Sequence, residues 1–199
     1  EVAYPVMSLN GDLIKLFGSN PSGQNLTVYT NSIVNSLYHR CVFRILYPNF
    51  KGKFTDAVSL MSYGDDVKMS VSKDFPLYNH TKIQEVFNSF GIDYTMAEKE
   101  AESVPFIDHV DADFLKRKSR WEPSYIYVDD DGHTHNGMWI AMLDKDSIFK
   151  SLHCNLSSKT QAQEEVAIQC ICGALREMFF YGKEEFDTFH VQMKKVVEK

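Results

Sequence analysis

Two adjacent carboxylates, Asp65 and Asp66, are the side chains of this sequence best suited to metal chemistry. They follow Gly64 in the middle of residues 57–71, where two short apolar-rich runs flank the Gly-Asp-Asp corner. Neighbouring carboxylates repel each other, and a divalent cation is the usual reason for a protein to hold them together. A solvated turn is the alternative explanation for an isolated Asp-Asp pair, so the choice between a metal site and a turn depends on the surrounding sequence.

A second polar group precedes this corner. Thr27 and Asn31 are four residues apart at the start of a predicted helix, so they share one of its faces, and they follow a loop of small residues that contains Ser22 and Gly23. Asn35 continues the same spacing. Since Thr and Asn near a helix start often cap backbone groups, we assign Asn35 to that structural role. Thr27 and Asn31 are assigned to ligand binding.

Periodicity predicts the elements that position these groups. Alternating apolar residues before and after Gly64 predict a β-hairpin over 57–71, because glycine permits a tight reversal. A four-residue repeat of Ile33, Leu37, Cys41 and Ile45 predicts a helix over about 24–46 with a broad apolar stripe. Asn10-Gly11 predicts a further hairpin, with strands over 6–9 and 13–17.

The rest of the chain alternates between the two patterns. The predicted elements are a helix over 81–90, strands over 125–128 and 138–142, and helices over 146–153, 160–181 and about 186–197. The loop between the two strands holds Asp129, Asp130, Asp131, His133 and His135. Turn chemistry accounts for its aspartates and glycine, and we favour it over metal binding there.

Composition sets limits on the function. The 199 residues are 44% hydrophobic and 24% charged, which is typical of a folded globular chain, and no apolar run approaches the ~20 residues of a membrane span. A net charge of −6 argues against a freestanding nucleic-acid-binding domain, which is normally basic. Four cysteines without disulfide-framework spacing favour a reducing compartment.

Two motifs in succession point to a family. Ser22-Gly23-x-x-x-Thr27-x-x-x-Asn31, followed by Tyr63-Gly64-Asp65-Asp66, resembles motifs B and C of the RNA-dependent RNA polymerases of picorna-like positive-strand RNA viruses. Residues 93–99 resemble motif D and end at Lys99. Phe114-Leu115-Lys116-Arg117, which we interpret as a basic strand, resembles motif E, the primer grip of that family.

The resemblance implies RNA synthesis by two-metal phosphoryl transfer. It makes Asp65 a ligand of Mg²⁺, with Mn²⁺ as a substitute, and Asp66 a weaker or indirect contributor. It assigns ribonucleoside triphosphate binding to Ser22, Gly23, Thr27 and Asn31, and a general-acid role to Lys99. Contact with the primer and the RNA falls to Phe114, Leu115, Lys116 and Arg117.

The resemblance also predicts an α+β fold: an antiparallel palm sheet packed with helices, then a mainly helical thumb. The palm would occupy 1–142, with motif B at 19–40, motif C at 57–71, motif D at 81–100 and motif E with its hairpin at 113–142; the thumb would occupy 143–199. No stretch before Ser22 matches motif A, and the fingers are missing too. We therefore expect an incomplete right-hand polymerase, inactive alone, whose partners are the remaining polymerase, an RNA template and primer, and ribonucleoside triphosphates. The expected location is a membrane-associated replication complex in the host cytoplasm.

Two alternatives remain open. Reverse transcriptases also carry a Tyr-x-Asp-Asp hairpin, although the Ser-Gly-x-x-x-Thr-x-x-x-Asn pattern and the Phe-Leu-Lys-Arg run argue against that class. The other alternative is a non-catalytic RNA-binding scaffold that retains the fold.

Overall fold

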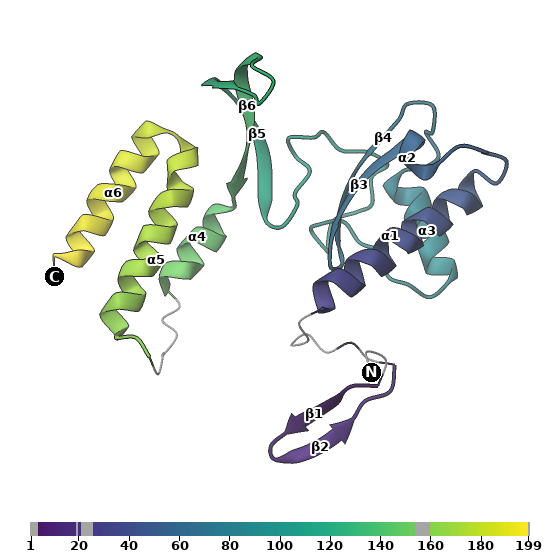
Figure 1. Cartoon of the computed structure of the whole chain (residues 1–199), viewed down its shortest axis with the longest axis horizontal. Helices are drawn as coiled ribbons and strands as arrows, with labels where there is room; N and C mark the ends of the chain where they lie inside the picture. The colour runs from purple at the N-terminus through teal and green to yellow at the C-terminus, as the bar shows by residue number, and fades with distance from the viewer. Residues whose placement is uncertain (1–3, 19, 21–25, 154–159, 199) are drawn as a thin grey trace. The chain divides into compact units, whose positions relative to one another are not determined.

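The structure is a computed structural model that describes residues 4–18, 20, 26–153 and 160–198. It forms two compact units, residues 1–106 and 107–199 (Figure 1). This division differs from the predicted boundary at 142/143, because the long hairpin of residues 117–143 contacts the helices that follow it. The assignment of segments to a palm and a thumb stays a prediction.

The first hairpin confirms the Asn-Gly prediction. Strand β1 (Val6–Leu9) pairs antiparallel with β2 (Asp12–Lys15), and Leu9 lies opposite Asp12. Asn10 and Gly11 both have positive φ, 52° and 96°, as a two-residue type I′ turn requires. The second strand is one residue earlier at its start, and two residues shorter at its end, than the sequence predicted.

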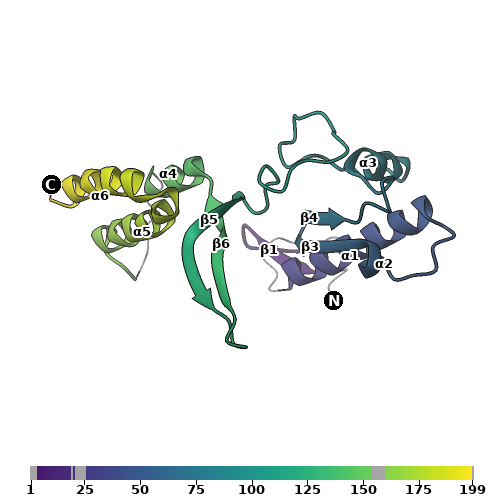
Figure 2. The same ribbon diagram turned by 90° about the horizontal axis from the view of Figure 1, so that it is seen from above.

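The rest of the first unit places a hairpin against two helices. Its elements are α1 (Thr27–Leu46), α2 (Phe54–Ala57), β3 (Val58–Tyr63), β4 (Asp66–Val71) and α3 (His80–Ser89). Helix α1 contacts β3 and α3, and the three elements lie together in both views (Figures 1 and 2). The predicted helix over 24–46 and the predicted hairpin over 57–71 are confirmed for the described residues, and α3 matches the helix predicted over 81–90.

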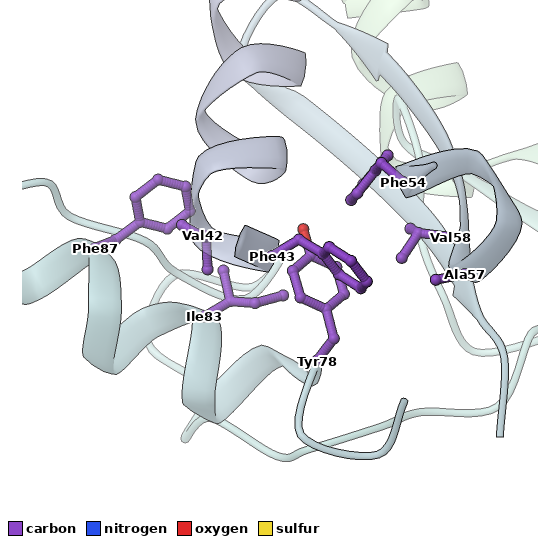
Figure 3. Close-up of a cluster of buried hydrophobic side chains, with 8 residues drawn as sticks. All are labelled: Val42, Phe43, Phe54, Ala57, Val58, Tyr78, Ile83 and Phe87. Carbon is purple, nitrogen blue, oxygen red and sulfur yellow. The ribbon is translucent and has the colours of Figure 1, made fainter. Parts of the chain in front are cut away.

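An aromatic core fastens these elements together. Its buried members are Val42, Phe43, Phe54, Ala57, Val58, Tyr78, Ile83 and Phe87 (Figure 3). The fully buried Phe43 ring lies 5.3 Å from the ring of Tyr78 and 5.4 Å from that of Phe54. Because truncating a buried Phe to Ala typically costs about 3–5 kcal/mol, this ring is a principal anchor of α1.

Helix α1 is apolar on two sides. Its buried face carries His39, Val42 and Phe43, whereas Ile33 and Leu37 of the predicted stripe are 62% and 54% exposed. Periodicity identified the helix, but it could not identify which apolar side this unit covers, because that depends on the partner elements.

The buried His39 is held by Tyr78. The Tyr78 hydroxyl donates to the His39 carbonyl oxygen at 3.0 Å, so His39 Nδ1, also 3.0 Å from that hydroxyl, acts as donor to it. His39 Nε2 has no hydrogen-bond partner among the described residues. Burial, with a smaller contribution from nearby His80, lowers the pKa of His39 to about 4, so this imidazole is neutral at pH 7.

The second unit combines one long hairpin with helices. Its elements are β5 (Arg117–Val128), β6 (Thr134–Leu143), α4 (Lys145–His153), α5 (Gln163–Met178), the 3₁₀ turn η1 (Phe179–Tyr181) and α6 (Lys183–Val197). Ile148, Ala174, Met178 and Phe189 form its buried core. The strands extend well beyond the predicted 125–128 and 138–142, and the predicted helices are confirmed with slightly shifted ends.

The fold class is α+β, as predicted, but the sheet prediction is met only in part. The strands among the described residues form three separate two-stranded antiparallel sheets, β1–β2, β3–β4 and β5–β6. No further strand in that part of the chain pairs with β3 or β4, so the described strands do not combine into one larger sheet. Among the described helices, none is both long enough and apolar enough to cross a membrane.

Candidate active site

The Gly-Asp-Asp corner is a two-residue hairpin turn. Tyr63 pairs with Asp66, so Gly64 and Asp65 are its two central residues. Gly64 has φ +65°, whereas Asp65 is not among the positive-φ residues, the pattern of a type II′ turn with glycine first. A Cβ at Gly64 would meet nothing within 4 Å. Glycine is therefore needed here for its backbone conformation rather than for space.

The carboxylates of this turn suit a hard divalent cation. Asp65 and Asp66 are both exposed, and carboxylate oxygens are the donors that Mg²⁺ prefers. The part of the chain that the structure describes holds no group of three or more His, Cys, Asp or Glu side chains placed to bind a metal. The two aspartates therefore fit the cation chemically but supply only part of a ligand set.

Ser32 of α1 fastens the turn from one side. Its hydroxyl donates to the Val28 carbonyl oxygen at 2.7 Å and accepts from the Gly64 backbone N–H at 2.8 Å. The Ser62 hydroxyl also donates to the Ser32 carbonyl oxygen at 3.3 Å. Both hydrogen-bonding functions of the Ser32 hydroxyl are thus used, one to fix its rotamer and one to hold the turn.

Asn35, one helical turn further along α1, fastens the turn again. Its Nδ2 donates to the Asp65 carbonyl oxygen at 2.9 Å and to the Gly64 carbonyl oxygen at 3.3 Å. The assignment of Asn35 to backbone capping is wrong, because its amide reaches across to another element. Ser32 was missed altogether. Asn35 precedes the buried His39 by four residues and Ser32 precedes it by seven, so all three share a helix face, but this spacing alone does not show that the face meets the hairpin.

The predicted nucleotide-binding residues are also brought together on α1. Thr27 Oγ1 donates to Asn20 Oδ1 at 3.4 Å, and Asn20 Nδ2 donates to Asn31 Oδ1 at 2.9 Å. Asn20 therefore links the two predicted residues, a contribution that the loop composition alone did not reveal. Ser22 and Gly23 lie outside the described residues.

Lys99, the predicted general acid, lies in the segment after α3. That helix ends at Ser89, and Gly91 with φ +71° follows. The Lys99 side chain is exposed, and none of the hydrogen bonds or ion pairs of the described residues joins it to Asp65. Its catalytic role stays a prediction.

Phe114–Arg117 is a tight turn, so the prediction of a strand over these residues is wrong. Phe114 and Arg117 exchange backbone hydrogen bonds of 3.0 and 3.1 Å, and the central residues Leu115 and Lys116 have φ of 56° and 61°. Asp113 Oδ1 accepts from the Lys116 backbone N–H at 3.0 Å. These contacts hold two non-glycine residues in a left-handed conformation that typically costs about 1–2 kcal/mol per residue.

The basic residues around this turn separate into two kinds. Arg117 donates to both carboxylate oxygens of Glu177, at 2.9 and 2.6 Å, and to the Ala141 carbonyl oxygen at 2.8 Å. Arg120 donates to the Phe180 carbonyl oxygen at 2.7 Å. Both arginines thus tie the hairpin to the helical segment, whereas Lys116 and Lys118 are exposed. The RNA contact of Arg117 stays a prediction, and its guanidinium already donates to Glu177 and Ala141.

The Asp- and His-rich loop between β5 and β6 is explained by turn contacts. Asp129 Oδ1 accepts from the backbone N–H groups of Asp131 and His133 at 3.1 and 2.8 Å, and Asp129 Oδ2 lies 2.7 Å from His135 Nε2. The hydrogen bond to His135, followed by the backbone N–H of His133, holds the pKa of Asp129 below its usual value. These contacts agree with our preference for turn chemistry over metal binding.

Comparisons with known proteins agree with the motifs. A family model described as viral RNA-dependent RNA polymerase matches residues 2–196. The chain is 31% identical over 176 residues to the replicase polyprotein of Drosophila C virus, covering 85% of this chain and 9% of the polyprotein. It is 28% identical over 193 residues to the replicase polyprotein of Cricket paralysis virus, covering 94% and 10%.

A solved structure supports the fold. The Sicinivirus 3Dpol RNA-dependent RNA polymerase aligns with a TM-score of 0.57 over 94% of this chain and 35% of its own, at 16% identity. The chain thus spans about a third of that polymerase and about a tenth of the two polyproteins. The resemblance to polymerases of picorna-like viruses is confirmed: with a family model matching nearly its whole length, the chain belongs to the viral RNA-dependent RNA polymerase family.

Proposed function

We propose that this chain is the part of a viral RNA-dependent RNA polymerase that presents the catalytic turn and selects the nucleotide. The complete enzyme would synthesise RNA from ribonucleoside triphosphates on a viral RNA template, in genome replication and transcription. One observation carries this proposal: a single helix, α1, holds the exposed Asp65 turn through Asn35 and bears the Thr27–Asn31 pair at its start.

Each group has a chemical task in this proposal. Asp65 and Asp66 would hold Mg²⁺, or Mn²⁺ in its place, and the bound ion would supply charge neutralisation at the phosphates. Asn31 and Thr27 offer an amide and a hydroxyl to the ribose 2′-hydroxyl, the group that distinguishes ribonucleotides from deoxyribonucleotides. Lys99 would give a proton to the leaving pyrophosphate. The turn at Leu115 and Lys116 would contact the primer strand, with Lys116 facing a phosphate.

The same proposal assigns the segments. The first unit, with the β5–β6 hairpin, would be the later part of a palm, and the helices after Leu143 would be a thumb. The missing metal ligand would come from a motif A strand, and the fingers from the remaining polymerase, so the chain alone would be inactive. A membrane-associated replication complex in the host cytoplasm is the proposed location.

Primer extension by the complete polymerase tests the proposal. Asp65→Asn keeps the side-chain shape but removes the charge, and we expect extension to fall at least about 100-fold, the scale on which a single electrostatic contact to a charged transition state acts. RNA affinity should be retained. Asp111→Asn, an exposed aspartate outside the motif ranges, is the matched control.

The outcomes also separate the alternatives. Retained extension by Asp65→Asn would favour the non-catalytic scaffold. Efficient incorporation of deoxyribonucleotides by the unaltered polymerase would instead favour the reverse transcriptase alternative.

A further inference from the structure

The backbone of the Gly64–Asp65 turn is held at consecutive groups by α1. Ser32 accepts from the Gly64 N–H, and Asn35 donates to the carbonyl oxygens of Gly64 and Asp65. A two-residue hairpin tip normally relies on its own cross-strand pairing, and this hairpin has no other strand beside it in the described part of the chain. Three hydrogen bonds from one helix therefore fix a tip that would otherwise bend freely.

The contacts act on the main chain of the turn and not on the Asp65 carboxylate. Asp65 is exposed, and Asn35 takes its carbonyl oxygen rather than its side chain. The helix that supplies these contacts is itself anchored four residues later by the buried His39 and then by Phe43. The position of the tip is thus tied to the aromatic core through one rigid element.

We infer that Ser32 and Asn35, hereafter the α1 clamp, are positioning residues that set where the Asp65 carboxylate stands for catalysis. This inference rests on the proposed function, because it gives the clamp a purpose in nucleotide addition. In this inference both residues act through the backbone of the turn and not by contact with substrate. Asn31 lies one helical turn before Asn35, so the same helix fixes the distance between the nucleotide-selecting amide and the turn.

Hydrogen exchange on the complete polymerase, without divalent cation or nucleotide, tests the clamp directly. Ser32→Ala removes the acceptor of the Gly64 N–H, and Asn35→Ala removes the donor to the turn. We expect peptides covering residues 60–68 to exchange faster in both variants, while peptides from the β5–β6 hairpin stay unchanged. Asn88→Ala, an exposed asparagine at the end of α3, is the matched control.

Kinetics then separates positioning from mere support of the fold. The single-turnover rate of nucleotide addition should fall about tenfold to 100-fold in Asn35→Ala, since a displacement of about 1 Å can cost that much. The KM for ribonucleotides, the RNA affinity and the melting temperature should stay close to those of the unaltered enzyme. Ser32→Thr keeps the hydroxyl, which in a helix can still bond the carbonyl four residues back, and should retain the rate that Ser32→Ala loses.

The outcomes are distinguishable. Unchanged exchange and rate in both clamp variants would overturn the inference, as would a parallel loss of rate, RNA affinity and melting temperature. If Asn35→Ala fails to fold, the Ser32→Thr and Ser32→Ala pair decides: equal rates overturn the inference, and rescue by Thr supports it. An unaltered polymerase that cannot extend a primer would remove the proposed function, while the exchange measurement would still report on the clamp.

Discussion

Two hairpin turns of this molecule carry predicted functional residues, and they are held in place by different means. The turn at Gly64 and Asp65 uses a glycine for its positive φ and takes its support from another element, through Ser32 and Asn35. The turn at Leu115 and Lys116 has two non-glycine residues at positive φ. Its supports are its neighbours in sequence, including the Asp113 carboxylate, and the Asp144 backbone N–H, which donates to the Lys116 carbonyl oxygen at 2.8 Å.

The difference indicates where each turn is vulnerable. The first turn has little backbone strain of its own, so whatever loosens α1 should move it. The second turn stores strain that its immediate surroundings offset, so it should respond to changes in its own residues and much less to the state of α1. Four predictions test this contrast.

Acid should affect the first turn most strongly, through His39. Its folded-state pKa of about 4 lies below the ordinary 6.5, so the unfolded chain binds more protons between these values. The contribution of the neutral His39 to the free energy of unfolding is therefore complete above pH 6.5. It is lost as pH falls toward 4, by up to about 3 kcal/mol at ~1.36 kcal/mol per pH unit. Thermal unfolding of the complete polymerase across this range, compared with His39→Gln, measures the effect.

The His39→Gln control keeps a donor near Tyr78 but cannot take up the proton. The variant should therefore show a shallower loss of stability below pH 6.5 than the unaltered enzyme. Hydrogen exchange should rise in residues 60–68 before it rises in residues 113–120. Identical pH profiles for the two proteins would remove His39 as the cause.

The conformation of Gly64 should matter next. In Gly64→Ala the added Cβ meets no neighbour, so the φ of +65° alone causes the effect, at about 1–2 kcal/mol. The chain should relieve this strain by moving the tip, and nucleotide addition should slow about tenfold to 100-fold. Primer extension measures this, with Gly91→Ala as control, because Gly91 also has positive φ and open space but lies at the end of α3. Equal losses from both substitutions would mean that the tip has no special requirement.

Arg117 should contribute to the stability of the second unit. Its two hydrogen bonds to Glu177 join β5 to α5, and both side chains are about a quarter to a third exposed, which reduces their value. We expect Arg117→Ala to lower the free energy of unfolding by about 1–2 kcal/mol while the rate at the Asp65 turn is retained. Denaturant unfolding measures the loss. A fall in RNA affinity without a loss of stability would instead support the predicted RNA contact of Arg117.

The two turns also differ in how far the sequence could predict them. The Asn-Gly and Gly-Asp-Asp motifs predict chain reversals because their residues tolerate or favour the backbone conformation of a tight turn. Both predicted hairpins are present in the structure. No propensity predicts Leu115 and Lys116 in a left-handed conformation, since only the surrounding contacts make that conformation stable. Asp113, which accepts from the Lys116 N–H, was the one local signal of a turn.

The α1 clamp shows a second limit of prediction from the sequence. Residues 27–46 were identified as a helix, yet the contacts of Ser32 and Asn35 depend on which face meets the hairpin. That face is determined by the aromatic core around Phe43, whose members come from α1, α2, β3, α3 and the loop before α3. Spacing within α1 places Asn35 with His39 as readily as with Asn31, and only the packed structure distinguishes these neighbours.

Lys116→Gly should give the smallest effect and the sharpest contrast between the turns, because its two consequences have opposite signs. Glycine accepts the φ of +61° without strain, and the exposed lysine side chain contributes little packing, so the free energy of unfolding should rise by about 0.5–1 kcal/mol. Loss of the charge that we propose to face a phosphate should at the same time weaken RNA binding and reduce its salt slope by about one. Lys118→Gly, which removes an exposed lysine from a regular strand, should lower stability, because glycine weakens strand interiors. Matching stability changes in the two variants would show that the left-handed backbone at Lys116 stores no strain.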